Sequence, residues 1–441
     1  MRITASDVAR WSGGRLIGSD ATADGASFDS RTISPGQFFV AVRGERDGHD
    51  HVADAVAAGA AFVLVEPGRG HTAPTRVEVD DTVAALGAVA TQVRVTMSAP
   101  VVGITGSVGK TSTKNMVAAV LGAAIARVHT AAGSFNNDLG VPVTVLGVPE
   151  GCGALVLEMG MRGHGEITRL CRIAPPDVGV ITVIGDAHSE RVGGIEGVVR
   201  AKGEILEGIA PGGTAVLNAD DPYEPALRRR VPEGVRTITF GSTMGADLRW
   251  QVTGRDDEGR ARMRIDHGDE TAECAVPFPG DHMAANAAAA LAVGLALGVS
   301  LADAARGLGD ATAEPGRMRW TTTTTGARLL DDSYNANVQS MMAALDTLAR
   351  TEADRRVAVL GAMAEVADPE RAHATVAAHA AGLGIDIIAF ETDLYGVAAR
   401  GLTEVIEALA ADASDAGAVV LVKGSRAAAT ERVVRALTSG V

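Results

Sequence analysis

A glycine-rich stretch with one lysine is the clearest place in this chain where residue types and spacing could do chemistry. GITGSVGKTS, residues 103–112, follows a β-branched run and precedes a helical pattern. Glycines at such a turn let backbone N–H groups close around phosphate oxygens, Lys110 supplies a point charge, and Thr111 offers a hydroxyl to Mg²⁺. Strict motif spacing would place a glycine at Ile104, so a turn without a ligand is the alternative. The context favours phosphate binding by Gly106, Ser107, Val108, Gly109, Lys110, Thr111 and Ser112.

Two further polar residues follow strand-like runs. Glu158 lies in ALVLEMG, and His188 follows VGVITVIGDA. Ligands of open parallel sheets sit at the carboxyl ends of the strands, where both residues are expected. Each residue alone also has a purely structural alternative: the carboxylate could cap a helix, and the histidine could form a hydrogen bond in its loop. Together with a phosphate loop they form the set expected for Mg²⁺, which is held by one or two protein groups plus phosphates.

Lys202 lies on the apolar face of a predicted helix over residues 194–210. Its neighbours three and four positions away are all apolar, so no acid on the same helix face can pair with it. The chain has only four lysines, and the other 36 basic residues are arginine. Burial lowers the pKa of a lysine, and the neutral amine is a nucleophile. We therefore hypothesise that Lys202 adds CO₂ and becomes a carbamate, an oxygen ligand for a second Mg²⁺. A snorkelling side chain and an ion pair with Glu158 are the alternatives.

Repeated strand, loop and helix patterns must position these groups. They predict an α/β fold in three domains, over residues 1–98, 99–313 and 314–441, with parallel sheets covered by helices. The stretch 249–280 alternates like antiparallel strands and is expected to add a hairpin layer to the middle domain. The threonine run 321–325 fits a strand as well as a linker.

Composition excludes several classes of protein. A net charge of −14 argues against sequence-independent binding to nucleic acid or to an anionic membrane. The three cysteines are widely spaced and form no metal-binding pattern, so a reducing cytoplasm fits best. The start of the chain lacks the apolar core of a signal peptide, and the longest apolar run is too short to span a bilayer. We expect a protein without membrane insertion and a monomer.

Nine stretches, in this order, resemble the Mur ligases, the ATP-dependent amide-forming enzymes of peptidoglycan synthesis: TGSVGKTS, SFNNDLGVP, LEMG, GDAHSE, AKGEI, LNADDP, EPGR, DDSYNAN and LVKGSR. The last two resemble the branch that joins UDP-N-acetylmuramoyl-tripeptide to D-alanyl-D-alanine. The resemblance implies a central ATP-binding domain, a small uridine-binding domain before it, and a C-terminal Rossmann-like domain. FDSRTISPGQFFVAVRGERDGHDHV resembles that uridine-binding domain, with Ser30 and Arg31 in the turn that contacts the nucleotide.

The resemblance also implies roles for single residues. Lys110 and the loop amides would hold the ATP phosphates, Thr111 and Glu158 the first Mg²⁺, and His188 with carbamylated Lys202 the second. Asn286 would contact the adenine, and Arg317 the γ-phosphate. Asp332, Tyr334 and Asn335 would lie on the ribose side. Asn137 and Lys423 would lie toward the acceptor peptide and the dipeptide. Lys114 has no assigned role.

Three positions depart from the family pattern, namely Ser189, Met283 and the residues after Glu365, and Met283 affects part of the adenine contact. Two rival functions are another amide ligase of the same fold, of the folylpolyglutamate or lysine-adding type, and a nucleotide-dependent switch or binding protein. DDSYNAN and the uridine-domain resemblance count against the first, and a switch has no need for Lys202 on an apolar helix face.

Overall fold

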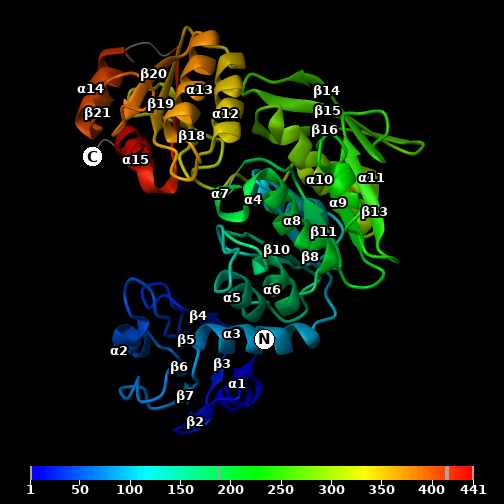
Figure 1. Cartoon of the computed structure of the whole chain (residues 1–441), viewed down its shortest axis with the longest axis vertical. Helices are drawn as coiled ribbons and strands as arrows, with labels where there is room; N and C mark the ends of the chain where they lie inside the picture. The colour runs from blue at the N-terminus through cyan, green and yellow to red at the C-terminus, as the bar shows by residue number, and fades with distance from the viewer. Residues whose placement is uncertain (1, 187–188, 413–416, 440–441) are drawn as a thin grey trace.

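Three α/β units follow one another along the chain in the computed structural model, which describes residues 2–186, 189–412 and 417–439 (Figure 1). The N-terminal unit lies at the bottom of the view, the central unit in the middle and the C-terminal unit at the top. Each unit has a sheet of its own. The predicted α/β fold class is therefore confirmed. In the described ranges, no helix is both long enough and apolar enough to cross a membrane.

The N-terminal unit has a five-stranded sheet in the order β2-β7-β6-β5-β4, antiparallel only between β2 and β7. Helix α3 closes this unit and packs on α5 and α6 of the central unit. Its elements are β1 (Ile3–Thr4), α1 (Ala5–Ser12), β2 (Arg15–Ile17), β3 (Thr22–Ala23), β4 (Ala26–Ser27), β5 (Phe38–Val40), η1 (Gly48–His51), α2 (Val52–Ala57), β6 (Val63–Val65), β7 (Arg76–Glu78) and α3 (Thr82–Val95).

The central unit has a nine-stranded sheet in the order β16-β15-β14-β13-β12-β11-β8-β10-β9. Its strands from β9 to β14 are parallel, and β14, β15 and β16 form the antiparallel layer that the sequence predicts. The strands are β8 (Val101–Thr105), β9 (Val128–Thr130), β10 (Ala154–Glu158), β11 (Val178–Ile181), β12 (Thr214–Asn218), β13 (Arg236–Gly241), β14 (Leu248–Arg255), β15 (Arg260–His267) and β16 (Glu270–Pro279).

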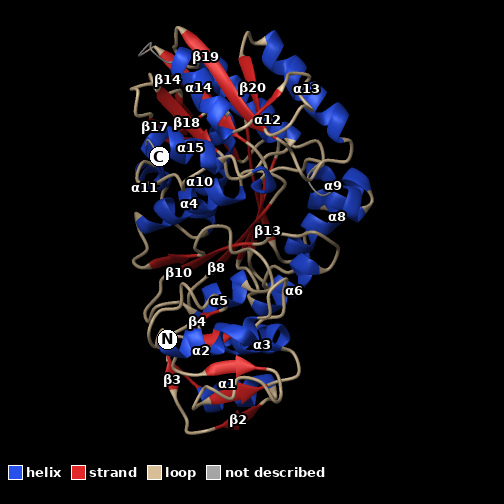
Figure 2. Cartoon of the chain, turned by 90° about the vertical axis from the view of Figure 1, so that its left-hand side faces the viewer, coloured by secondary structure: helices blue, strands red, loops and turns tan. Residues whose placement is uncertain are grey.

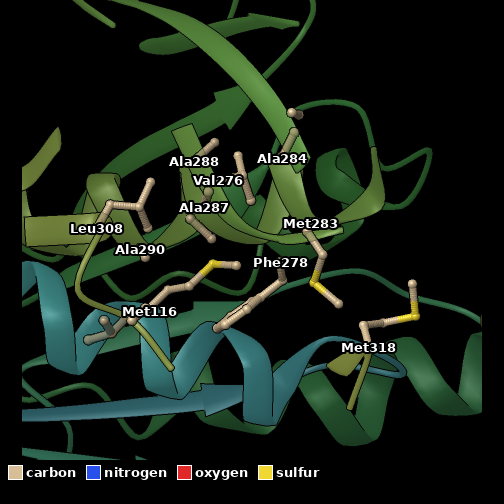
Figure 3. Close-up of a cluster of buried hydrophobic side chains, with 14 of the residues drawn as sticks. Met116, Val276, Phe278, Met283, Ala284, Ala287, Ala288, Ala290, Leu308 and Met318 are labelled. Atoms are coloured by element: carbon tan, nitrogen blue, oxygen red, sulfur yellow. The ribbon is translucent and has the colours of Figure 1, made fainter. Parts of the chain in front are cut away.

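Helices cover both faces of the parallel strands, which explains why these strands read as continuous apolar runs. Figure 2 shows α4 and α10 on one side of the sheet, with α5 and α6 on the other. The alanine-rich α10 lets α4 approach closely, and Met116, Phe278 and Met283 fill the space between them (Figure 3). The helices are α4 (Lys110–Gly122), α5 (Gly140–Leu146), α6 (Glu166–Ile173), α7 (Ser189–Val192), α8 (Gly194–Glu207), α9 (Glu224–Arg228), α10 (His282–Ala296) and α11 (Leu301–Leu308).

The C-terminal unit has a six-stranded sheet in the order β17-β18-β22-β19-β20-β21, parallel except at β17. The threonine run is divided, because β17 ends at Thr322 and a turn follows. The elements are β17 (Arg319–Thr322), β18 (Arg328–Asp332), α12 (Val338–Arg350), β19 (Arg355–Gly361), α13 (Pro369–Gly382), β20 (Asp386–Phe390), β21 (Ala399–Arg400), α14 (Leu402–Asp412), β22 (Ala418–Lys423), η2 (Arg426–Ala428) and α15 (Glu431–Ser439).

Candidate active site

A cavity of about 510 Å³ lies between the central and C-terminal units, at the carboxyl ends of parallel strands. This is the edge at which open α/β sheets bind ligands. Most of the predicted site residues line it: Ser107, Val108, Gly109, Lys110, Thr111, Ser112, Asn137, Glu158, Lys202, Asn286, Arg317, Asp332, Tyr334, Asn335 and Lys423. His188 lies outside the described residues.

The glycine-rich stretch forms the turn between β8 and the start of α4, as its sequence predicts. Gly106 has φ +148°, and a Cβ there would lie 1.9 Å from Thr182 Oγ1. Gly109 has φ +85°, and a Cβ there would lie 2.4 Å from Asn286 Oδ1. Only glycine satisfies both the backbone angle and the space at these two positions. The turn therefore lines the cavity while its glycines pack closely against Thr182 and Asn286.

The side chain of Ser107 holds the neighbouring loop. Its hydroxyl donates to the carbonyl oxygen of Gly185 at 2.8 Å and accepts from the Gly185 amide at 2.8 Å. The carbonyl of Val108 accepts a hydrogen bond from Thr182 Oγ1 at 2.6 Å. These bonds tie the phosphate-loop turn to the loop after β11, so both strand ends hold one another in place.

Two lysine side chains share one carbonyl oxygen in this turn. Lys110 Nζ donates to Gly106 O at 2.7 Å, and Lys202 Nζ donates to the same oxygen at 3.0 Å. Lys202 is only 1% exposed. Burial holds the pKa of Lys202 well below its usual 10.5, and the charge of Lys110 lowers that pKa further. The site therefore favours an uncharged amine at Lys202.

The two alternatives for Lys202 do not match this geometry. Snorkelling is excluded because the whole side chain is buried on α8. Within the described residues, Lys202 Nζ has Gly106 O as its hydrogen-bond acceptor and forms no ion pair with Glu158. The charge of Glu158 raises the pKa of Lys202, but burial and the charge of Lys110 have larger effects in the opposite direction. The lysine thus reaches the phosphate-loop turn from a helix far along the chain.

Glu158, at the end of β10, is held by two hydrogen bonds. Thr111 Oγ1 donates to Glu158 Oε2 at 2.8 Å, and Asn136 Nδ2 donates to Glu158 Oε1 at 2.7 Å. Both Thr111 and Glu158 are buried. A hydroxyl and a carboxylate oxygen are hard donors of the kind Mg²⁺ prefers. Within the described residues, no group of three or more histidine, cysteine, aspartate or glutamate side chains could hold a metal. Phosphate oxygens could add to the ligands of a cation at this point.

The C-terminal unit contributes cations to the same cavity. Arg317 Nη2 contacts Thr111 Oγ1 at 3.4 Å, and its guanidinium lies over the ring of Tyr334, 4.0 Å from the centroid. The hydroxyl of Tyr334 is hydrogen-bonded to Ser134 of the central unit. Arginine and tyrosine therefore bridge the two units beside the phosphate-loop turn.

Lys423 and Asp332 face each other at the carboxyl ends of β22 and β18. They form a buried ion pair, and Lys423 Nζ also donates to the carbonyl oxygen of Asn335 at 2.9 Å. Burial lowers the pKa of Lys423, and Asp332 opposes that shift. Both residues line the cavity, and the ammonium of Lys423 is bonded to Asp332 and Asn335 of its own C-terminal unit.

The wall opposite is formed by the start of α10. Asn286 lies against Gly109, and its amide donates to Met283 Sδ at 3.4 Å. Met283, which departs from the family pattern, thus packs directly on Asn286. His282 lines the same wall, and burial lowers its pKa to about 4. This histidine is uncharged at neutral pH.

Ser30 and Arg31 lie in the N-terminal unit, away from the residues that line the cavity. Arg31 binds Asp29 through two nitrogens, at 2.9 and 2.6 Å, and holds the pKa of Asp29 at about 2. The adjacent Phe28 ring packs on Phe135, with 5.6 Å between centroids. Phe135 belongs to the loop that also carries Asn137. The turn of Ser30 and Arg31 is therefore connected to the cavity wall through one aromatic contact.

Sequence reasoning missed two contributors. Asn136 donates to Glu158, a contact that the sequence did not indicate. Asn137, expected near the acceptor peptide, lines the cavity, and its Oδ1 accepts from the Leu139 and Gly140 amides at the start of α5. Lys114 is fully buried and pairs with Glu314 at 2.9 Å. Its isolation as one of four lysines was the signal that could have identified it.

Comparison with known families agrees with this geometry. Residues 104–294 match the Mur ligase middle domain, and residues 316–440 match the model described as Mur ligase, glutamate ligase domain. The chain is 35% identical to the UDP-N-acetylmuramoyl-tripeptide–D-alanyl-D-alanine ligase of Escherichia coli, over 99% of this chain and 98% of the relative. It is 40% identical to the ligase of the same name from Mycobacterium tuberculosis, over 77% and 72% of the two chains.

Solved structures extend the similarity to all three units. MurF from Acinetobacter baumannii has a TM-score of 0.87 and 30% identity, covering 99% of both chains. MurF from Thermotoga maritima, solved in complex with ADP, has a TM-score of 0.80 and 29% identity, covering 94% of this chain and 96% of the other. A full-length relative above 30% identity and a shared three-unit fold lead to one conclusion: this chain belongs to the Mur ligase family.

Proposed function

We propose that this chain is a ligase of the MurF type, which joins D-alanyl-D-alanine to UDP-N-acetylmuramoyl-tripeptide and converts ATP to ADP and phosphate. The observation that supports this most directly is the single cavity in which Lys110 of the central unit and Arg317 of the C-terminal unit meet. Relatives that carry this name match most of the chain. The product serves peptidoglycan precursor synthesis.

The proposed nucleotide site follows the geometry of the cavity. Backbone amides of residues 106–112 and the ammonium of Lys110 bind the phosphates, and Arg317 adds a cation at the γ-phosphate. Asn286 contacts the adenine, and Asp332, Tyr334 and Asn335 lie on the ribose side. The ammonium of Lys110 donates to Gly106 O in this structure and has two further N–H donors that can contact a phosphate oxygen.

Thr111 and Glu158 would hold the first Mg²⁺, because their oxygens are hard, buried and 2.8 Å apart beside the phosphate-loop turn. The cation would neutralise charge on the phosphates. For a second cation, the proposed ligands are His188 and a carbamate on Lys202. In that modification the neutral amine attacks CO₂, a C–N bond forms and one proton is released. Two observations support it: burial favours the uncharged form of Lys202 that this reaction needs, and its Nζ lies at the phosphate-loop turn, 3.0 Å from Gly106 O.

Ligation proceeds in two steps. The terminal carboxylate of the tripeptide attacks the γ-phosphorus of ATP, and ADP leaves with formation of an acyl phosphate. The free amine of D-alanyl-D-alanine then attacks the acyl carbon, phosphate departs and the amine loses a proton. Positioning and charge neutralisation by Lys110 and Arg317 account for catalysis of the first step. The approach of the C-terminal unit would also exclude water from the acyl phosphate.

We also propose the bounds of the domains, the residues that contact the substrates, and the partners of the protein. The domains extend over residues 1–98, 99–313 and 314–441. Ser30 and Arg31 bind the uridine part of the UDP-sugar, and Asn137 and Lys423 contact the acceptor peptide and the dipeptide. We propose a cytoplasmic monomer whose partners are small molecules, without a nucleic-acid partner and without membrane insertion. The net charge of −14 supports the last two points.

The test measures phosphate release with ATP, Mg²⁺, UDP-N-acetylmuramoyl-tripeptide and D-alanyl-D-alanine. Release is expected only when all components are present, and the pentapeptide product should appear in equal amount by mass spectrometry. The Lys110→Gln variant is the control, because it should abolish release while a contaminating ATPase would persist. Release that continues without the dipeptide, or that requires glutamate or lysine in its place, would refute the proposed function.

A further inference from the structure

The segment that enters the C-terminal unit runs antiparallel to the first two turns of α4. Residues 312–317 follow the helix closely enough for side chains to bridge them. Three contacts do so, with the donor first: Asn115 Nδ2 to Thr312 O at 3.1 Å, Lys114 Nζ to Glu314 Oε1 at 2.9 Å, and Arg317 Nη2 to Thr111 Oγ1 at 3.4 Å. The helix that starts at the phosphate loop therefore also carries the segment that delivers Arg317.

Lys114 is the most engaged group of this contact. The residue is 1% exposed, and the three N–H donors of its ammonium face three oxygens. These are Ala131 O at 2.9 Å, Gly133 O at 2.7 Å and Glu314 Oε1 at 2.9 Å. A planar guanidinium could not direct its donors to three such converging oxygens. A lysine is therefore required here for a reason unrelated to that at Lys202.

The attachment of this segment changes from the central to the C-terminal unit between Glu314 and Gly316. Glu314 is bound to α4 through Lys114, whereas the amide of Gly316 donates to Asp331 Oδ2 at 2.9 Å and the carbonyl of Gly316 accepts from the Tyr334 amide at 3.1 Å. Asp331 and Tyr334 belong to the C-terminal unit. By these contacts the junction between the units falls at Pro315, within two residues of the domain boundary proposed from the sequence, and Arg317 lies on its far side.

The other two oxygens around Lys114 come from the loop that follows β9. Further along this loop, Ser134 is bonded to Tyr334 and Asn136 to Glu158. One ammonium therefore supports both sides of the phosphoryl site. It bonds the loop after β9, whose Asn136 orients Glu158. It also bonds Glu314, which precedes the junction at Pro315, and Arg317 follows that junction.

We propose that Lys114 is a positioning residue for phosphoryl transfer, which anchors the central-unit end of the Pro315 junction so that Arg317 reaches the γ-phosphate. This inference rests on the proposed ligase function. Lys114 does not line the cavity, so it acts only through Arg317 and Glu158. Displacement of a catalytic group by about 1 Å can cost about 100-fold in rate. Loss of the anchor should therefore lower kcat and leave ATP binding nearly intact.

The kinetic test compares four variants of the full chain. Lys114→Met should lower kcat about 10-fold to 100-fold with the KM for ATP within about threefold of the native value. Glu314→Ala should lower kcat in the same way, and Glu314→Gln, whose amide oxygen still accepts, should stay within about threefold. Arg94→Met is the matched control, because Arg94 bonds Asp177 and Met97 O and none of these three residues lines the cavity. It should lower the thermal midpoint without changing kcat.

Hydrogen exchange measured by mass spectrometry on the ligand-free proteins provides a readout that does not depend on activity. Lys114→Met should accelerate exchange in residues 131–137 and 311–317 and leave the strands of the C-terminal sheet unchanged. An inactive native protein would refute the proposed ligase function while this measurement still tests the anchor. Unchanged kcat, a rise in KM alone, or uniformly faster exchange throughout the chain would each overturn the role of Lys114.

Discussion

Replacement of Lys202 by methionine tests whether this buried lysine serves chemistry or packing. The two side chains have similar length and volume, so methionine fits the space on α8 without a new cavity. Lys202 Nζ contributes one hydrogen bond, to Gly106 O, and that oxygen keeps its bond from Lys110 in the variant. The substitution therefore removes an amine and almost nothing else.

The expected change in stability is small and its sign depends on pH. Loss of one hydrogen bond costs about 1 kcal/mol, and removal of a buried amine offsets that cost. Burial lowers the pKa of Lys202 below 10.5, so the unfolded chain binds more protons than the folded one below that pH. The free energy of unfolding of the native protein therefore decreases as pH falls from about 10.5, and the variant lacks this contribution. At neutral pH we expect Lys202→Met to be as stable as the native protein, or more stable.

The activity of Lys202→Met, in contrast to its stability, should fall strongly. Without the amine no carbamate forms, and loss of one preorganised electrostatic group costs about 100-fold to 1,000-fold in kcat. Lys202→Arg should be equally inactive, because a guanidinium does not lose its proton. Carbon-13 NMR with labelled bicarbonate should show a carbamate signal in the native protein that is absent from Lys202→Met. A variant with kcat within tenfold of native, or one destabilised by more than about 3 kcal/mol, would refute this reasoning, since the latter loss is typical of a paired buried charge.

Asn136, His282 and Lys423 can each be tested by one substitution. Asn136→Ala should weaken binding of Mg²⁺ with ADP about 10-fold to 100-fold in calorimetry, because Glu158 loses its orienting donor; unchanged affinity would show that Asn136 only packs. His282→Gln should flatten the pH dependence of stability between pH 6.5 and about 4, where the native protein loses about 2–3 kcal/mol as the unfolded state gains a proton first; denaturant titrations at several pH values measure this. Lys423→Met should destabilise the protein by about 3–5 kcal/mol because Asp332 stays buried and charged, and Asp332→Asn added to it should recover part of the loss, which denaturation of both variants will show.

Much of the fold follows from patterns that act over short distances. The β-branched runs predicted the parallel strands because both sheet faces are covered, and the strict alternation in residues 249–280 predicted the antiparallel layer. The glycine-rich turn before Lys110 was also predicted from local patterns, because a strand-like run precedes it and a helical pattern follows it. The apolar neighbours of Lys202 correctly indicated that its side chain is buried.

Contacts between distant segments could not be predicted in this way. The acceptor for Lys202 is a backbone oxygen 96 residues away, and a carbonyl has no signature in a sequence. Asn136 and Asn137 are adjacent and chemically identical, so only the direction of the loop decides which of them reaches Glu158. Lys114 is separated from Glu314 by 200 residues, and their contact depends on how residues 312–317 lie along α4.

The distribution of lysine also determines how the protein meets amine-selective reagents. Three of the four lysines are at most 2% exposed, and Lys110 is the one with partial exposure, inside the cavity. An acylating reagent that reacts with lysine should therefore label Lys110 first, and a nucleotide in the cavity should protect it. Because the remaining basic residues are arginines, the outer surface contributes no competing lysine signal. Footprinting by mass spectrometry thus becomes a direct measure of cavity occupancy, without any engineered probe.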